Sequence, residues 1–228
     1  MVMAAMMPRR IDRGILRVLR TGVLAVAATS AAYWLALRPR HLRWGASESD
    51  VTRRWPGDDL VVAPYTRAVR AVTVHAPVGD VWPWIMQVGR ERGGFYSYTW
   101  LENLVGADIR NVDHLIPGLP DRRPGDTVWM APAEKFGGTA RMIVGRLIPE
   151  RAMVLVPPGD AERVLNGGHA EGAWSFVLDP VSEGTTRFVM VSLASKPRLA
   201  DLFFWEPAHF VMERKMMLTI KALAERGT

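Results

Sequence analysis

A histidine shares a helical stripe with methionines near the C-terminus. In the segment AHFVMERKMMLTIKALAER, His209, Met212 and Met216 fall at i, i+3 and i+7, which places them on one helix face. A titratable imidazole inside an apolar cavity is how a proton-transfer residue is often placed. The alternative is a structural histidine with satisfied hydrogen bonds, beside methionines that are plain core. His209 is therefore the candidate catalytic residue, and Met212 a candidate for a pocket wall.

The stretch RERGGFYSYTWLENLVG gathers aromatic side chains after a double glycine. Its aromatic residues are Phe95, Tyr96, Tyr98 and Trp100. Large aromatics usually fill a core, but binding sites for small molecules are also mostly apolar with a few polar groups. Tyr96 and Tyr98 are the better ligand candidates, because each hydroxyl needs a partner and could orient a guest.

The familiar catalytic and metal-binding motifs are missing. The chain has no cysteine, which excludes disulfides, thiolate nucleophiles and cysteine-based zinc sites. It has no GxSxG, HExxH or phosphate-binding glycine loop with a lysine. The histidines are scattered, and the adjacent pair Asp113-His114 is a weak signal, so we expect no metal and no cofactor. The glycine-rich NGGHAEG (166–172) is expected to be a hairpin turn.

The basic charge of the chain is confined to its N-terminal segment. Residues 1–43 contain eight arginines and one acid, which leaves 21 basic and 22 acidic residues in 44–228. A nucleic-acid-binding surface needs clustered Lys and Arg on a folded face, and the near-neutral remainder offers none. We therefore expect no nucleic-acid partner.

Residues 21–37, TGVLAVAATSAAYWLAL, form an uncharged run between Arg20 and Arg38. Seventeen helical residues rise about 25 Å, the short limit for a bilayer, and flanking arginines can snorkel. The run predicts a transmembrane anchor, with a cleaved signal peptide or a buried soluble helix as alternatives. Five arginines precede it and three follow, which favours a single-pass protein with an exported globular domain. The predicted domains are 1–43, the basic segment with the anchor, and 44–228.

The remaining chain alternates strand and helix patterns. Ser47 with Asp50 predicts a helix start, and a helix is expected at 78–88, a second at 97–105, and a long one from Pro207 towards Gly227. The β-branched run 68–75 is the first expected strand. Turn-rich separators divide the further expected strands, which are 127–131, 138–148, 152–156, 172–178 and 186–195. The spacing suits an antiparallel meander.

This order of elements resembles the helix-grip fold of the START/polyketide-cyclase-like (SRPBCC) superfamily. VTVHAPVGDVWPWI (72–85) is similar to the first strand and helix start of that superfamily. RWGAS, GGFYSYTWLENLVG and EPAHFVMERKM resemble a bacterial membrane-tethered subgroup, and the likeness covers roughly residues 43–225. The resemblance implies an α+β fold in which a curved antiparallel sheet wraps around the C-terminal helix, with an apolar cavity between them.

The resemblance also implies which side chains meet a ligand. Strand alternation places Arg187 towards solvent and Phe188 with Met190 on the opposite, concave face. The expected ligand-binding residues are Phe95, Tyr96, Tyr98, Trp100, Trp129, Trp174, Phe176, Phe188, Met190, His209 and Met212. Members of the superfamily bind lipids, sterols or polyketide-like molecules, and a minority catalyse cyclisation or dehydration.

Two classes of function follow from these patterns. The first is a membrane-tethered domain that binds or carries an apolar small molecule or lipid. The second is a cyclase- or dehydratase-like enzyme that uses His209, a tyrosine or Glu102 for proton transfer. A structural envelope protein with a vestigial cavity is a third. Binding is favoured, because no acid–base pair stands out.

Overall fold

The computed structural model describes residues 13–196, 199 and 201–227 and has two compact units, Met1–Arg40 and His41–Thr228. The described part of the first unit is helical. Helix α1 (Arg13–Ala32) continues through a π-helical turn, η1 (Tyr33–Leu37), into α2 (Arg38–Leu42). Among the described residues, no helix combines the length and apolarity needed to cross a membrane. The anchor expected at 21–37 stays a prediction.

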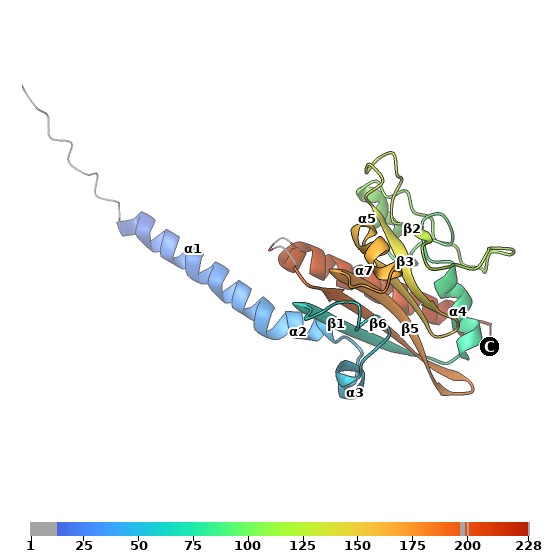
Figure 1. Ribbon diagram of the computed structural model, residues 1–228. Coiled ribbons are helices and arrows are strands. Elements are labelled where there is room, and N and C mark those ends of the chain that lie inside the picture. Colours follow the sequence, from blue (N-terminus) through green and yellow to red (C-terminus); the bar gives the residue numbers. More distant parts are fainter. Residues whose placement is uncertain (1–12, 197–198, 200, 228) are drawn as a thin grey trace, which may run out of the picture. The chain divides into compact units, whose positions relative to one another are not determined.

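An antiparallel sheet dominates the second unit (Figure 1). In the described residues it has six strands in the order β1-β6-β5-β4-β3-β2, so the first strand pairs with the last. The strands are β1 (Thr66–Val74), β2 (Thr127–Trp129), β3 (Arg141–Ile148), β4 (Ala152–Val156), β5 (Gly172–Ser182) and β6 (Thr185–Ala194). Every strand expected from the sequence is present, and the antiparallel meander from β2 to β6 is confirmed.

The two largest differences between predicted and observed strand ends each have a local reason. Strand β3 begins at Arg141 rather than at residue 138, because Gly137 and Gly138 adopt φ of 57° and 70° in a turn. Strand β5 continues to Ser182. A shift in register between Pro180 and Ser182 accommodates the proline, which has no N–H for a regular ladder of hydrogen bonds.

Short helices and one long helix complete the unit. They are α3 (Glu48–Thr52), α4 (Val78–Met86), α5 (Thr99–Leu104), the 3-10 turn η2 (Pro158–Asp160), α6 (Ala161–Leu165), the π-helical turn η3 (Asp201–Trp205) and α7 (Glu206–Ala224). The hairpin turn expected at NGGHAEG is wrong, since η2 and α6 lie in the connection between β4 and β5. The buried carboxylate of Asp160 closes this loop by accepting a hydrogen bond from the backbone N of Glu171 at 2.8 Å.

Both faces of the sheet are covered. Alternating strand residues and α7 form one core, which includes Val72, Val74, Trp174, Phe176, Phe188, Met190, Met216, Met217 and Ile220. On the other face, residues such as Val69, Val177 and Val191 pack under Trp55, Leu60, Val61 and Val164. This double burial explains why β4 is apolar and buried at every position, unlike a strand with one wet face.

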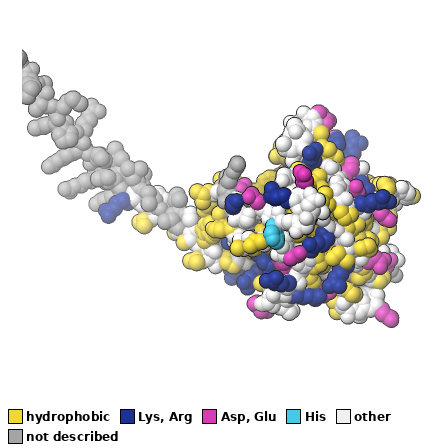
Figure 2. Space-filling view, viewed as in Figure 1, with side chains coloured by type: hydrophobic (Ala, Val, Ile, Leu, Met, Phe, Trp, Pro, Cys, Tyr) yellow, Lys and Arg dark blue, Asp and Glu magenta, His cyan; other side chains and the backbone are white. Residues whose placement is uncertain are grey.

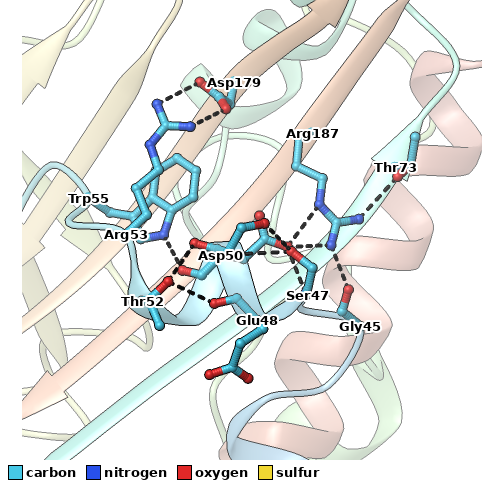
Figure 3. A network of polar contacts seen from close by, with 11 residues as sticks. Gly45, Ser47, Glu48, Asp50, Thr52, Arg53, Trp55, Thr73, Asp179 and Arg187 are labelled. Atoms are coloured by element: carbon cyan, nitrogen blue, oxygen red, sulfur yellow. Dashed lines mark hydrogen bonds and ion pairs between the residues drawn. The ribbon is translucent and has the colours of Figure 1, made fainter.

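The segment before β1 is fastened to the outer face by charged contacts (Figure 3). The expected helix start is confirmed as a capping box, in which Ser47 and Asp50 satisfy each other's backbone amides. Arg187 lies on the face opposite Phe188, as expected, but its exposure to solvent is corrected. Its guanidinium donates to Asp50 Oδ2 and the Gly45 carbonyl at 2.6 Å each and to Thr73 at 3.0 Å. Elsewhere the visible surface of this unit mixes both charge signs with hydrophobic side chains (Figure 2).

Candidate ligand-binding cavity

A cavity of about 480 Å³ opens where β1 begins and β6 ends. Its floor consists of two rows of paired residues that cross three strands. In one row Ala68 pairs with Ser192, which pairs with Trp174; in the next, Thr66 pairs with Ala194, which pairs with Gly172. Side chains from η3, the first turn of α7 and the hairpin between β2 and β3 form the walls.

A buried charge pair lies at the inner end of this cavity. Arg70 follows Ala68 by two residues on β1, and its Nη1 donates to Glu213 Oε2 on α7 at 2.8 Å. Both side chains are almost fully buried, with relative exposures of 1% and 0%. Ser192 Oγ also lies 3.3 Å from the same carboxylate oxygen, and Arg70 and Ser192 line the cavity. The carboxylate of α7 is thereby held by groups from two strands, β1 and β6.

The backbone and an aromatic ring fix the guanidinium of Arg70 on its other side. Its Nε donates to the His41 carbonyl at 2.7 Å, and its Cζ lies 5.3 Å from the centre of the Phe210 ring. Next to it, His41 Nε2 lies 3.7 Å from Glu206 Oε1, and Glu206 lines the cavity. Titratable groups therefore follow one side of the cavity, from Glu206 to Glu213.

His209 belongs to this polar cluster and also lines the cavity. Its Nδ1 lies 3.4 Å from Glu213 Oε2, one helical turn further along α7. Burial lowers the pKa of His209 below 6.5; the charge of Glu213 opposes this effect and that of Arg70 adds to it. The lowered pKa favours the neutral imidazole, in which a proton on Nδ1 would let it face the carboxylate as a donor. Nε2 then remains as an acceptor.

The Trp174 ring forms the apolar wall of the cavity beside His209 and packs against two aromatic rings of the core. The Trp174 ring lies 5.3 Å from the imidazole, 4.7 Å from Phe176 and 6.3 Å from Phe95, the last in a stacked arrangement. The buried Nε1 of Trp174 makes no hydrogen bond with the described residues. The cavity thus combines an aromatic wall with a cluster of acid, base and hydroxyl groups, the composition typical of a small-molecule site.

The residues expected to bind a ligand are found in three settings. Trp174 and His209 line the cavity, and Phe176, Phe188, Met190 and Phe95 are buried in the core that the sheet shares with α7. Met212 is half-buried on α7. Trp129 and Tyr98 are half-buried under Arg141 and Lys215, whereas Trp100 has 68% of its surface exposed and does not contribute to the lining.

Tyr96 has a structural partner for its hydroxyl. Gln87 Nε2 donates to the phenolic oxygen at 2.6 Å, and burial raises the pKa of Tyr96 to about 12. The residue also adopts a left-handed φ of 56°, held by Asn111 Oδ1, which accepts from the Tyr96 backbone N at 2.7 Å. This tyrosine fixes the loop after Gly93-Gly94, and its ring is part of the core.

Two other candidates for proton chemistry lie apart from the cavity. Glu102 on α5 is only 3% exposed, its carboxylate oxygens have no partner among the described residues, and burial raises its pKa to about 7. It does not line the cavity. Asp113 and His114 are exposed neighbours, and within the described ranges no group of three potential ligands could hold a metal ion.

Arg70, Ser192 and Glu213 were not among the site residues predicted from the sequence. A signal for Arg70 was present, since it has the same parity in its strand as Ala68 and Val72, which face α7. A charged residue at such a position must find a buried partner. Glu213 follows His209 by four residues, so helical spacing places the two side chains next to each other on one face.

The comparisons with known proteins find similar solved structures at low sequence identity. No family model and no curated protein matches the chain. Among solved structures, it is similar to protein NE0264 of Nitrosomonas europaea, with 13% identity over 76% of this chain and 100% of that chain and a TM-score of 0.43. It is also similar to the Polyketide_cyc-like protein Cgl2372 of Corynebacterium glutamicum, at 14% identity over 70% and 90% of the two chains and a TM-score of 0.33.

A third similar structure is the self-sacrificing resistance protein CalC of Micromonospora echinospora, at 11% identity over 72% and 93% of the chains and a TM-score of 0.37. The fold class itself, an antiparallel sheet that holds a long C-terminal helix, follows from the strand order and the shared core.

Proposed function

We propose that this protein binds an apolar small molecule, such as a lipid or a polyketide-like compound, in the cavity between β1, β6 and the start of α7. The observation that carries the proposal is the cavity of about 480 Å³, a size within the usual range for ligand sites. Its lining is mostly apolar, while Arg70, Ser192 and His209 offer hydrogen bonds at one side. A ligand with an apolar body and one polar group fits this arrangement.

A blocking substitution tests the proposal. Ala194 lines the cavity at the end of β6 and is half-buried, so the Ala194→Trp indole would occupy ligand space with little core to displace. We expect affinity for an apolar fluorescent dye, such as an anilinonaphthalene sulfonate, to fall at least tenfold, roughly the effect of losing 1.4 kcal/mol of binding free energy.

Ala194→Ser is the matched control and should bind the dye as the wild type does. Circular dichroism of both variants checks that the fold is retained. A folded Ala194→Trp protein with unchanged dye affinity would refute binding in this cavity.

A specific observation supports the second candidate, an enzyme of the cyclase or dehydratase type. His209 lines the cavity and faces a buried carboxylate, burial lowers its pKa, and this pair could move a proton to or from a bound substrate. We expect His209→Asn to remain folded and to weaken binding of the co-purified ligand by roughly 5- to 30-fold, the effect of one lost hydrogen bond.

Native mass spectrometry, together with chromatography of the extracted ligand over time, separates the two candidates, because a ring closure without loss of water changes the retention time but not the mass. If the protein only binds, both the mass and the retention time of the ligand stay constant in wild type and variant. A product formed by the wild type but not by His209→Asn would favour the enzyme instead. The exposed His75→Asn is the control and should change neither affinity nor ligand mass.

We also propose that residues 21–37 tether the domain to the cell membrane, with the domain on the extracytoplasmic side. The uncharged run between Arg20 and Arg38 and its helical conformation support the tether. The excess of arginines before the run supports the orientation. A tether of this kind would hold the cavity close to a reservoir of apolar molecules.

A further inference from the structure

Large aromatic side chains stand exposed beside the opening of the cavity. In η3, Phe204 is 77% and Trp205 63% exposed, while their neighbour Leu202 is buried. Trp205 and Leu202 also line the cavity, so this π-helical turn is part of its rim. Exposing adjacent aromatic residues in water is unfavourable, and such a patch at the entrance of an apolar cavity points to an apolar surface that covers it.

The short connection between the proposed tether and the cavity indicates which apolar surface covers this patch. Leu42 lines the same cavity, and only residues 38–41 separate it from Leu37, the end of the proposed tether. Five residue steps span at most about 18 Å. If 21–37 lies in the bilayer, covalent geometry alone keeps this part of the cavity rim near the membrane surface. Arg38, Arg40 and Arg43 in the same stretch suit lipid phosphates.

We infer that the η3 rim of the cavity docks on the lipid bilayer, with Phe204 and Trp205 in the interfacial region, so that the ligand enters and leaves through the membrane. Aromatic side chains, tryptophan above all, favour this depth. Two adjacent aromatics offer far less than the roughly 1,000 Å² that a stable protein interface buries, but they suffice for an anchored domain to contact lipid. The inference rests on the proposed tether and on the ligand cavity.

Single labelled positions in the full chain test the inference. Because the chain has no cysteine, Phe204→Cys and Val181→Cys each accept one thiol-reactive bimane fluorophore. Val181 is a matched control, since it is 64% exposed and lies at the opposite end of β5 from the cavity. The proteins are reconstituted in vesicles of phosphatidylcholine and phosphatidylglycerol that contain lipids with a nitroxide close to the headgroup.

We expect strong nitroxide quenching and a blue-shifted emission at position 204, and neither at 181. Quenching at both positions would indicate unspecific adsorption and would overturn the docking. Alkaline extraction of the same vesicles reports on the tether separately. An unquenched 204 in a chain that resists extraction overturns the docking and leaves the tether intact. Quenching at 204 alone in a chain that alkali releases supports the docking and contradicts the tether.

The exchange rate of the ligand gives a second measurement. Phe204 does not line the cavity, so Phe204→Ser should leave the equilibrium affinity for a fluorescent fatty acid unchanged in the full chain. We expect transfer of that probe between vesicle and protein to slow roughly tenfold, the effect of removing one large apolar side chain from the contact. Val181→Ser should transfer the probe at the wild-type rate. Equal rates for both variants would overturn the docking, whereas a wild-type chain that binds no probe would refute the ligand cavity instead.

Discussion

Arg70→Met is expected to lower the free energy of unfolding by about 3–5 kcal/mol, because it leaves the buried carboxylate of Glu213 without its charged partner. Ser192 and His209 remain near Glu213 Oε2, at 3.3 and 3.4 Å, but they do not replace the guanidinium charge, and Glu213 Oε1 has no partner among the described residues. Urea unfolding followed by circular dichroism measures the change. The matched control is Arg146→Met, which breaks an exposed pair with Asp59 and should cost less than about 1 kcal/mol.

The double variant Arg70→Met with Glu213→Leu should recover most of the stability that the single variant loses. Two apolar side chains of similar size remove both desolvation penalties, and such replacements are often neutral. A single Arg70→Met variant as stable as Arg146→Met would contradict the buried pair. A double variant that remains as unstable as the single one would show that the loss comes from the contacts of Arg70 with His41 and Phe210.

The same double variant separates stability from function. If the double variant is stable but no longer holds the co-purified ligand, the charge pair serves ligand binding in the cavity wall and not stability. Arg70 lines the cavity with a guanidinium whose Nε and Nη1 are already committed to His41 and Glu213. A side chain fixed by those bonds loses little conformational entropy when it meets the polar group of a ligand.

The fold could be predicted because its information is local. Alternation in 186–195 indicated which face of β6 carries Phe188 and Met190, and proline and glycine marked the separators. The pairing of β1 with β6 was not predicted, since residues 112 to 128 positions apart in the chain leave no local signal. For the same reason the Arg70–Glu213 pair was not predicted. The pair forms only when the fold brings the first strand, the last strand and α7 together.

The site could be predicted only in part, for a related reason. His209 was identified because helical spacing alone placed it on a stripe with Met212 and Met216. The aromatic stretch was less informative, because its four neighbouring residues have four different environments. The Phe95 ring is in the core, the Tyr96 hydroxyl has a structural partner, Tyr98 is half-buried and Trp100 is exposed. The direction of each side chain depends on the left-handed backbone conformation at Tyr96. This conformation is uncommon for a tyrosine and cannot be predicted from the residue type.

Glu102→Gln is expected to stabilise the protein, and to do so more strongly as pH rises. Burial raises the pKa of Glu102 to about 7, whereas the unfolded chain has a value near 4.5. The folded state therefore binds more protons than the unfolded state between these values, so this group's contribution to stability falls as pH rises from about 4.5 to 7 and stays low above. Glutamine has no charge to bury and escapes that loss.

After allowance for solvent screening, the gain of Glu102→Gln over wild type should be about 2 kcal/mol larger at pH 8 than at pH 5. Urea unfolding at both pH values measures it, with the exposed Glu183→Gln as a control that should show no such difference. An equal gain at both pH values would mean that the carboxylate finds a partner when it ionises. Because Glu102 lies outside the cavity lining, the variant should bind the apolar dye as wild type does, which distinguishes a structural acid from a functional one.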